Sequence, residues 1–405
     1  MIDLLDFVNE NGINGRKASN KKSIIRGLAK CEDSLTIPEI AILIDVSIPI
    51  CTSLIRGLVT SRLVTKEGKK TSENGRKPFT YSLNKGSFHV VGVEILSKFI
   101  QLSVFSIDLE LIHTNTIKGF TLSKDIECLK NITHFIESSL KDSGIDKKNI
   151  IGIGVGMPEV VKDHNGELTT YFSDEEISLK EYLESQIKLS VLIDNDTRTI
   201  GVAEQTLGSA KGIDNVLVVK VSRTLGLSII ANKSILKGSQ GLAGGMNHTQ
   251  FKKGVRPCCC GKIGCLGTEV GGDALLVDLN DALRDNEISI HFNIQDLPTY
   301  GYHDVLDAVL KGDELSIKLI QDQGYKLGKA LGNIMNVLNP ELVLIGGEYA
   351  MVKNFFVDAV KIGVRKTALI STMKNCEVKA SVLGRYLGVK AEACMFLKAC
   401  DMIAF

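Results

Sequence analysis

The chain lacks the features that mark membrane and secreted proteins. Its 405 residues contain no apolar run of 18 residues, so the sequence predicts no membrane span. Residues 1–6 have neither the basic start nor the long apolar core of a secretion signal. The net charge is also close to zero, at +1. What remains is the composition of a globular protein long enough for two or three domains with sizeable cores.

A regularly spaced disulfide framework is missing as well. Four of the ten cysteines lie within residues 258–265, and the other six are scattered in mostly apolar contexts. The cluster follows His248, and Gly261 and Gly264 allow tight backbone turns between its members. Soft thiolates with one imidazole are typical of a closed, structural zinc site, and a disulfide is the alternative. Zinc thiolates need a reducing compartment, so the sequence predicts a cytoplasmic protein.

The charge is distributed unevenly along the chain. Residues 1–85 carry fourteen lysines and arginines against nine aspartates and glutamates, about +5, which leaves about −4 for the remainder. A basic bias in one small segment is typical of a nucleic-acid-binding end attached to a neutral body. On charge alone, a solvated lysine-rich surface explains the bias equally well.

Three short helical patterns and a hairpin follow a polar arm at residues 1–22. The helices are predicted over residues 23–30, 36–44 and 47–60. Thr36 is the expected N-cap of the second helix, and Ser47 that of the third. Residues 62–83 then alternate as two strands around a polar, basic tip. Three helices and a basic hairpin indicate a winged helix-turn-helix domain over residues 1–85.

The third helix of such a domain enters the major groove by its N-terminal end. Its early, exposed side chains are predicted to meet base edges, and these are Ile48, Pro49, Thr52 and Ser53. Basic side chains of the helix and the hairpin tip are predicted to meet phosphates or the minor groove, and these are Arg56, Lys69, Lys70, Arg76 and Lys77. The alternative is a small helical interaction module that binds no nucleic acid.

From about residue 87, strands alternate with helices. Strands are predicted over residues 89–95, 99–107, 111–117, 149–156, 191–194, 215–221, 225–230 and 342–347. Helices are predicted over residues 124–143, 199–207, 272–283, 302–310 and 314–338. This alternation is typical of an α/β body made of two similar lobes with a cleft between them.

Four segments carry a resemblance to a known family. They are Ile151-Gly-Ile-Gly-Val-Gly-Met-Pro158, Ile193-Asp-Asn-Asp196, Gly241-Leu-Ala-Gly-Gly-Met-Asn-His248 with the cysteine cluster, and Asn336-Val-Leu-Asn-Pro-Glu-Leu-Val-Leu-Ile-Gly-Gly347. With these motifs the chain resembles the ROK family of sugar-responsive repressors and sugar kinases. The resemblance implies an actin-like ATPase (ribonuclease H-like) body over residues 86–405. Its first lobe would comprise about 86–194 plus the C-terminal helix, and its second lobe about 195–380.

The resemblance also implies metal ligands and sugar contacts residue by residue. The implied zinc ligands are His248, Cys258, Cys260 and Cys265. Cys259 is left out because the gap of one residue between 258 and 260 matches the family. The sugar-contacting pair falls on Asn195 and Asp196, and in the kinases this aspartate is the general base. The zinc-bound histidine reaches the sugar in relatives, so His248 is expected to couple metal and ligand.

The phosphate loops depart from the family pattern. Kinases of the family open with Asp-x-Gly-Gly-Thr, and here the matching residues are Glu94-Ile-Leu96-Ser97-Lys98. The second loop, usually Gly-Thr-Gly-Ile-Gly, reads Ser222-Arg-Thr224-Leu-Gly226. Side chains at Leu96, Ser97 and Thr224 prevent the backbone from cradling phosphate in the same way. The sequence therefore predicts that the chain is not an enzyme, and an ATP-dependent sugar kinase that has kept its aspartate is the alternative.

The implied sugar site is altered too. Relatives have one glutamate three residues before the zinc histidine and another two residues after the last cysteine, and here these positions are Gly245 and Gly267. Glu269 can substitute if the loop shifts, and Arg198 offers a cation. The hypothesis that follows is an effector bulkier or more anionic than a neutral hexose, such as a phosphorylated, acidic or oligomeric sugar. A decayed site that binds no sugar is the alternative.

Together these patterns predict a cytoplasmic, sugar-responsive transcriptional regulator that acts as a repressor. Its expected partners are a double-stranded DNA operator and a carbohydrate or sugar-phosphate effector, and its expected assembly is a homodimer or a dimer of dimers. A sugar would favour one lobe arrangement and change the spacing of two winged helices. By family analogy, a helix near residues 383–397 returns to the first lobe and contacts the DNA-binding domain. A regulator controlled by a protein partner is the third class left open.

Overall fold

The computed structural model divides the chain into two compact units. It describes residues 13–31, 33–69, 78–159, 161–162, 167–168, 172, 178–251, 255–383 and 387–402. The first unit comprises the chain up to Thr199 together with the segment from Gly388 onward, and the second runs from Ile200 to Leu387. The division falls inside helix α6 (Asp196–Leu207). Residues 195–199, which the sequence assigns to the second lobe, therefore belong to the first unit.

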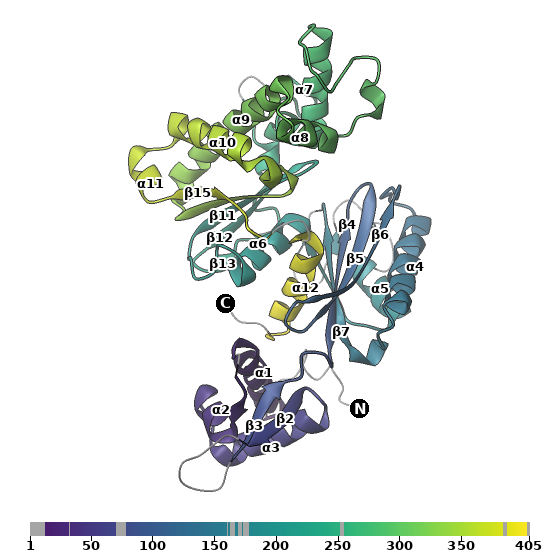
Figure 1. Cartoon of the computed structure of the whole chain (residues 1–405), viewed down its shortest axis with the longest axis vertical. Helices are drawn as coiled ribbons and strands as arrows, with labels where there is room; N and C mark the ends of the chain where they lie inside the picture. Colours follow the sequence, from purple (N-terminus) through teal and green to yellow (C-terminus); the bar gives the residue numbers. More distant parts are fainter. Residues whose placement is uncertain are drawn as a thin grey trace. The chain divides into compact units, whose positions relative to one another are not determined.

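The N-terminal part of the first unit is a three-helix module with a small sheet (Figure 1). Its elements are α1 (Ile13–Lys30), β1 (Leu35–Thr36), α2 (Ile37–Leu43), α3 (Ile48–Thr60), β2 (Val64–Lys69) and β3 (Phe79–Leu83). Strands β2 and β3 form an antiparallel hairpin, and β1 pairs with the other edge of β3. Fully buried Ile24, Ile25, Ile40 and Ile55 form the core of this module. These helices and this hairpin correspond to those predicted.

Helix α1 begins earlier than the sequence predicts. Residues 13–22, predicted as a polar arm, form its first turns. The segment carries no apolar periodicity, but its lysines, arginine and alanine are good helix formers. Because the buried residues Ile24, Ile25 and Leu28 anchor the helix by tertiary packing, the polar turns extend an existing helix without a new nucleation cost.

Local capping builds the corner between α2 and α3. Thr36 and Glu39 form a reciprocal capping box at the start of α2, with the Thr36 N–H donating to Glu39 Oε2 at 2.7 Å. The chain bends by 106° between the two helices, within the range of a helix-turn-helix. Asp45 adopts a left-handed conformation in the turn, with φ of 54°. Ser47 lies at the predicted N-cap position of α3, but its side chain makes no capping hydrogen bond.

Two five-stranded sheets, one in each unit, share one topology. Their strand orders are β10-β7-β4-β5-β6 and β15-β14-β11-β12-β13. In each sheet three consecutive strands form an antiparallel meander, and the next strand runs parallel to the first of them, with the fifth parallel to the fourth. The strands are β4 (His89–Ile95), β5 (Phe99–Ser106), β6 (Leu111–Lys118), β7 (Ile150–Met157), β10 (Val191–Asn195), β11 (Val216–Val221), β12 (Leu225–Ala231), β13 (Ser234–Ile235), β14 (Leu342–Gly346) and β15 (Glu377–Ala380). This repetition confirms the predicted α/β body of two similar lobes.

Helices cover both sheets. Those that follow α3 are α4 (Ile126–Asp142), α5 (Leu179–Ile187), α6, α7 (Gly272–Arg284), α8 (Tyr302–Leu310), α9 (Glu314–Leu338), α10 (Lys353–Thr367), α11 (Ile370–Lys374) and α12 (Leu387–Ala399). Short 3-10 turns include η2 (Lys147–Asn149), η3 (Met246–His248), η4 (Leu266–Thr268), η5 (Leu297–Thr299) and η6 (Glu348–Val352). The remaining hairpin pairs β8 (Val161–Lys162) with β9 (Glu167–Leu168).

Helix α12 lies directly on the first sheet, while α4 and α5 cover the opposite face (Figure 1). A Cβ atom on Gly92 of β4 would collide with the carbonyl of Val389 in α12. On β7, Gly152, Gly154 and Gly156 share one face because side chains alternate along a strand, and a Cβ on any of them would collide with α12. The glycine-rich segment at residues 151–158 therefore allows close packing of a helix.

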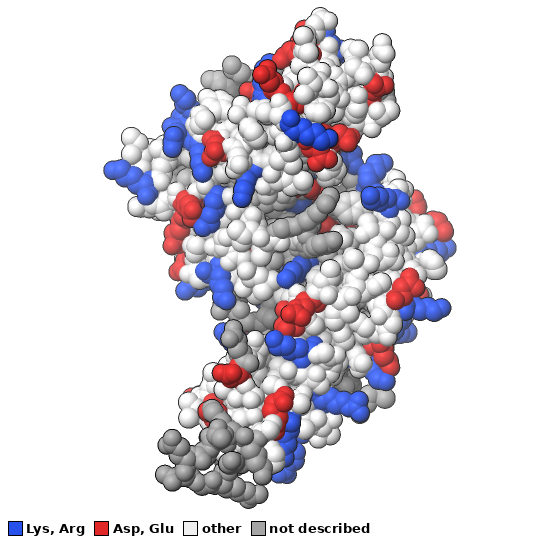
Figure 2. All heavy atoms as spheres, in the orientation of Figure 1, with Lys and Arg blue, Asp and Glu red and all other residues white. Residues whose placement is uncertain are grey.

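The surface carries charges of both signs. Basic and acidic side chains are interspersed over the face drawn in Figure 2, in keeping with a net charge of +1. Among the described residues, no single helix is long and apolar enough to cross a membrane, although the bent pair of α2 and α3 meets that test by length and composition.

Candidate functional site

Helix α3 presents an exposed face near its N-terminal end. Its predicted base and phosphate contacts lie there as exposed or half-buried side chains, and these are Ile48, Pro49, Thr52, Ser53 and Arg56. The hydroxyl of Thr52 donates to the carbonyl of Ile48 at 2.7 Å. Ile50, which the sequence did not single out, is 49% exposed beside them. The opposite face, with Leu54, Ile55 and Leu58, is buried in the module, so the exposed face is available to a partner.

The hairpin predicted as the wing is described in part. Lys66 of β2 places its ammonium group 3.5 Å from the centre of the Phe79 ring, which ties the two strands together. Lys69 is the last residue of β2, and only its backbone is described. Three predicted phosphate contacts, at Lys70, Arg76 and Lys77, lie outside the described residues.

The four side chains implied as zinc ligands lie together in the second unit. One ligand atom from each of His248, Cys258, Cys260 and Cys265 falls within 4.8 Å of all the others. His248 Nδ1 lies 3.5 Å from Cys258 Sγ, and Cys260 Sγ lies 3.6 Å from Cys265 Sγ. A tetrahedral zinc site with Zn–S bonds of about 2.3 Å separates its sulfurs by roughly 3.8 Å. The donor set and its spacing therefore fit a zinc ion.

A tight backbone hairpin sets the spacing of the thiols. The N–H of Cys258 donates to Lys262 O at 2.8 Å, and the N–H of Gly261 donates to Cys258 O at 2.9 Å. Gly261 and Gly264 adopt φ of 85° and 77°, a region that favours glycine, as predicted for turns between ligands. The three thiols of the cluster thus project from a turn whose backbone groups are hydrogen-bonded to one another.

The thiols of the cluster differ in their acidity. Desolvation and the neighbouring thiols raise the pKa of Cys265 to about 12. The backbone N–H of Lys262 lowers the pKa of Cys260. Cys259 is exposed, and its Sγ is not part of the group of four ligand atoms.

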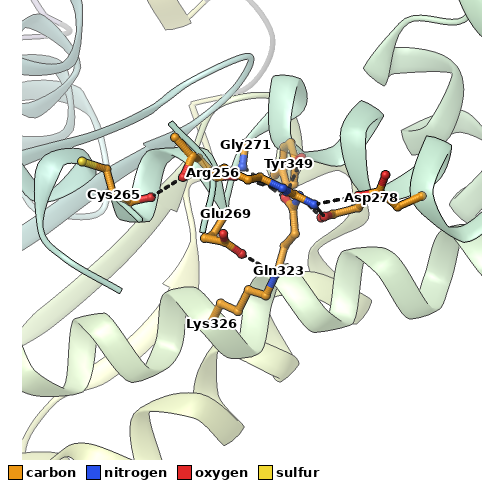
Figure 3. Close-up of polar contacts among 10 residues, drawn as sticks. Arg256, Cys265, Glu269, Gly271, Asp278, Gln323, Lys326 and Tyr349 are labelled. Atoms are coloured by element: carbon orange, nitrogen blue, oxygen red, sulfur yellow. Dashed lines mark hydrogen bonds and ion pairs between the residues drawn. The ribbon is translucent and has the colours of Figure 1, made fainter. Parts of the chain in front are cut away.

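Arg256 joins the loop from His248 to Cys265, here called the metal loop, to helix α7 (Figure 3). Its Nη1 donates to Thr268 O at 3.2 Å, and its Nη2 donates to Asp278 Oδ1 at 2.7 Å and to Asp281 Oδ2 at 3.3 Å. The carbonyl of Arg256 accepts from the N–H of Gly264 at 2.9 Å. The bonds from Arg256 to the two carboxylates are charge-assisted, and such bonds are stronger than those between neutral groups. Arg256 was not among the predicted site residues, although its position two residues before Cys258 is a signal visible in the sequence.

A second part of this network reaches helix α9 (Figure 3). Gln323 is fully buried, and its Nε2 donates to Asp278 Oδ2 at 2.9 Å. Its Oε1 accepts from the N–H of Gly271 and from the hydroxyl of Tyr349, each at 3.1 Å. Buried polar groups that are hydrogen-bonded in this way make a rigid connection. The metal loop is therefore fastened to α7, α9 and η6.

Glu269, a predicted effector contact, forms an ion pair next to this network (Figure 3). Glu269 is 7% exposed, and its Oε2 accepts a hydrogen bond from Lys326 Nζ on α9 at 2.9 Å. The carboxylate of Glu269 is buried and the lysine is half-buried, so Glu269 is paired with α9. Lys326 was not predicted, because its partner lies 57 positions away in the chain.

The turn between β10 and α6 holds the other predicted sugar contacts, in the first unit. Asn195 Oδ1 accepts from the N–H groups of Thr197 at 3.0 Å and Arg198 at 3.1 Å, and Asn195 Nδ2 donates to Glu159 O at 3.0 Å. Because this amide caps the helix, α6 begins at Asp196, three residues before the predicted start. Asp196 itself is 6% exposed and accepts from the Thr197 hydroxyl at 3.2 Å.

Arg198 differs from the cation that the sequence suggested. It is 3% exposed, and its Nε donates to Asp194 Oδ1 at 2.6 Å while Nη2 donates to Val161 O at 2.9 Å. Its charge is therefore neutralised by Asp194, and the guanidinium positions the turn that carries Asn195 and Asp196.

Two glycines that flank the metal loop have different surroundings. A Cβ on Gly245 would meet only Leu242 O, at 3.6 Å, so this position is open. A Cβ on Gly267 would lie 3.1 Å from both Cβ and O of Asn247. Asn247 therefore occupies the space that a side chain at 267 would need. Its Nδ2 lies 3.2 Å from Nε2 of His248.

The two phosphate-loop positions form closed turns. In the first, the N–H of Leu96 donates to Phe99 O at 2.9 Å, and Ser97 O accepts from the N–H of Leu122 at 3.2 Å. This turn is a hairpin between β4 and β5 whose residues 96 and 97 are half-buried.

The second turn lies against the start of α7. The N–H of Ser222 donates to Thr224 O at 3.0 Å, and Ser222 O accepts from the N–H of Gly272 at 2.8 Å. Arg223 Nε donates to Asp273 Oδ1 at 2.9 Å. The first-turn N–H of Gly272 is thus bound to the loop itself, and a carboxylate stands beside it.

Comparisons with known proteins agree with this architecture. A family model described as "ROK family" matches residues 90–398. A xylose repressor from Caldicellulosiruptor bescii is 23% identical over 370 residues, which cover 91% of this chain and 92% of that protein. A glucokinase from Halalkalibacterium halodurans is 28% identical over 265 residues, which cover 64% of this chain and 80% of that protein. The solved structure of a ROK family transcriptional regulator, a homologue of the E. coli MLC protein, matches the fold with a TM-score of 0.78 at 18% identity and covers 99% of this chain and 98% of that one.

Proposed function

Because the chain belongs to the ROK family, we propose that it is a sugar-responsive DNA-binding transcriptional regulator and that it acts as a repressor. The observation that carries this proposal is the N-terminal helix-turn-helix with its exposed α3 face, which precedes the residues that the family model matches. The relative named as a repressor aligns over 91% of the chain, whereas the glucokinase aligns over 64%. The same proposal includes a cytoplasmic location and a homodimer or a dimer of dimers.

We propose that α3 reads an operator through its exposed residues. The early residues Ile48, Pro49, Thr52 and Ser53 would meet base edges, and Arg56 one turn later would meet a phosphate. The hairpin would supply further cations through Lys69, Lys70, Arg76 and Lys77. The strong bend between α2 and α3 supports this assignment because it leaves the N-terminal end of α3 prominent.

The ion that we propose for the cysteine cluster is zinc. His248, Cys258, Cys260 and Cys265 would hold it with four ligands and leave no coordination position for a substrate, which is the pattern of a structural site. Zinc in such a site supplies cohesion and no reaction chemistry. The loop from His248 to Cys265 would then be ordered both by the ion and by the Arg256 network.

We propose that the effector is a sugar and that Asn195, Asp196 and His248 are its candidate contacts. Asn195 retains one amide N–H beyond the bonds that cap α6. Glu269 and Arg198, the other candidates, would support the site through their ion pairs with Lys326 and Asp194. A sugar that binds one arrangement of the units more tightly would shift the population and so weaken operator binding.

The competing function is an ATP-dependent sugar kinase, which the match to a glucokinase and the presence of Asp196 favour. Side chains at Leu96, Ser97 and Thr224 oppose it. The turn at Ser222 also opposes kinase activity. Its carbonyl accepts a hydrogen bond from the N–H of Gly272, which is a helix N-terminal donor that a phosphate would otherwise use.

A pair of assays decides between the two functions. The first measures phosphate transfer from ATP with purified protein across a panel of neutral and acidic sugars, and we expect none above background. The second measures binding to a duplex from the region upstream of the chain's own gene, for the wild type and for Arg56→Ala. Loss of a phosphate contact should weaken binding and make the salt dependence shallower by about one unit of slope. Arg284→Ala, which alters an exposed arginine on α7, is the matched control.

A further inference from the structure

We propose that the exposed face of α3 reads the methyl groups of thymine, so that the operator carries A·T pairs where this helix enters the major groove. This inference rests on the proposed function, because it concerns what the same helix recognises. Two isoleucines near the start of the helix lie on the surface, Ile48 at 54% and Ile50 at 49% exposed. They lie outside the core of the module, to which α3 contributes its other face.

The same face offers few groups that can form specific hydrogen bonds to bases. Among the 13 residues of α3, all of which the structure describes, Arg56 alone carries a charge, and none carries an amide, a carboxylate or an imidazole. Guanine and adenine are read most specifically by bidentate contacts from Arg, Lys, Asn or Gln. The hydroxyl of Thr52 donates to Ile48 O at 2.7 Å, so this donor is used within the helix. The hydroxyl of Ser53 can donate or accept, and it therefore discriminates little between base pairs.

Alkyl side chains can distinguish thymine from the other bases. The C5-methyl group of thymine is the apolar group that a base edge presents in the major groove, and alkyl side chains contact it. Burial of one group of this size raises affinity by about threefold to fourfold. A cytosine would instead place its N4 amino group against an isoleucine and leave that donor without a partner. Ile48 and Ile50 therefore favour A·T pairs.

The charge around the isoleucines favours DNA as the partner of this face. Residues 1–85 carry fourteen lysines and arginines against nine aspartates and glutamates. Arg56 lies on the exposed side of α3, and Lys66 is exposed on the adjacent strand β2. The bend of 106° between α2 and α3 is that of a helix-turn-helix. An apolar reading surface with cations beside it matches a groove whose bases are flanked by phosphates.

The test begins with a selection, because the operator sequence is not required for it. The zinc-loaded full chain selects from a pool of duplexes with a random central sequence. The enriched duplex is then made with thymine or with uracil in its half-sites, and uracil lacks only the methyl group. A duplex with uracil outside the half-sites alone is the control for the DNA. Fluorescence anisotropy measures the affinity for each duplex at several salt concentrations.

Two protein variants accompany the wild type. The first is the double variant Ile48→Ala and Ile50→Ala, and thermal melts check that it is folded. The second, Ile112→Ala, removes the same alkyl group from β6, where Ile112 is 48% exposed, and is the matched control. We expect the wild type and the control to bind the uracil duplex about tenfold more weakly than the thymine duplex, and the double variant to show a difference of about threefold or less. The salt slope should be the same for both duplexes, because the phosphate contacts are unchanged.

Three results would overturn the inference alone and leave DNA binding intact. They are enrichment of G·C pairs in the half-sites, equal affinity of the wild type for the thymine and uracil duplexes, and a difference that the double variant retains in full. If no duplex is enriched or bound, the proposed function falls as well. A smaller assembly of the double variant in light scattering would then assign the isoleucines to a contact with a second copy of the chain.

Discussion

At the scale of single residues, glycines set how closely helix α12 approaches the first sheet. Gly154 of β7 faces the carbonyl of Glu392, and a Cβ there would collide with it. We therefore expect Gly154→Ala to lower the free energy of unfolding by about 2 kcal/mol, since neither backbone can move without disturbing the core. Chemical denaturation measures the loss, and Gly86→Ala, which would meet nothing within 4 Å, is the control. Equal stability of the two variants would contradict the close packing described for α12.

A buried carboxyl group in α6 gives the second unit a dependence on pH. Burial raises the pKa of Glu204, and its hydrogen bonds from Ser381 and from the N–H of Ser209 oppose that shift only in part. A folded-state pKa above the unfolded value means that this group contributes most at acid pH and that its contribution is lost as the pH rises through the folded pKa. Glu204→Gln keeps an acceptor for Ser209 and a donor for Ser381 without the charge.

We accordingly expect the melting temperature of Glu204→Gln to rise relative to the wild type as the pH increases from about 4 toward 8. Thermal melts at a series of pH values measure this difference. Glu110→Gln, at an exposed position, should show a constant difference over the same range. A difference for Glu204→Gln that does not change with pH would mean that Glu204 is ionised in the folded protein as readily as in the unfolded chain.

Which residues the sequence could identify depended on whether their partners are local. The residue types and short spacing of the cysteine cluster after His248 indicated a zinc site, and the resemblance to the family selected His248, Cys258, Cys260 and Cys265 as its ligands. Arg198 is an exception, because it was assigned a free charge although Asp194, with which the structure pairs it, lies only four positions earlier. Lys326 was overlooked because its partner, Glu269, lies 57 positions away in the sequence.

At the scale of elements, the metal loop is stabilised from two sides, by the thiol cluster and by the Arg256 network. Arg256→Gln removes the charge that meets Asp278 and Asp281 but leaves the loop backbone in place. Substitution of residues that orient a metal site without binding the metal typically lowers metal affinity by about 10- to 100-fold. We expect Arg256→Gln to lower the affinity for zinc by about tenfold. Competition with a chromophoric chelator measures the affinity for zinc.

Arg284→Gln is the control for that measurement, because it removes an exposed arginine from the same helix, α7. The control should bind zinc as the wild type does. Equal affinities of Arg256→Gln and Arg284→Gln for zinc would contradict this expectation. The network would then connect α7 and α9 without stabilising the metal loop.

Elements with strong periodicity or strong caps were predictable. The sequence predicted α8 and α9 at the bounds that the structure gives them, because each carries a long apolar stripe. The first turns of α1 were not predicted, because their polar residues are helical only as an extension of the segment whose apolar residues pack in the module core. The sequence also missed the start of α6, whose cap is supplied by Asn195 in the preceding strand.

At the scale of the whole molecule, α12 connects several parts of the first unit. The hydroxyl of Thr199 donates to Glu392 at 3.0 Å, three residues after Asp196 in the candidate sugar site. Just beyond the C-terminal end of α12, Asp401 accepts from Arg26 of α1 at 3.1 Å. The predicted contact between the last helix and the N-terminal module is thus represented by an ion pair at the end of α12. An exposed pair of this kind contributes little to stability.

The central claim is that a sugar controls the affinity of this protein for DNA. Its most direct test is fluorescence anisotropy of a labelled duplex from the region upstream of the chain's own gene, titrated with the zinc-loaded full chain with and without each sugar of the panel. We expect the protein to bind the duplex tightly and in a salt-dependent manner, and at least one acidic or phosphorylated sugar to weaken that binding about tenfold or more. Affinity for no such duplex, or an affinity that every sugar leaves unchanged, would contradict it.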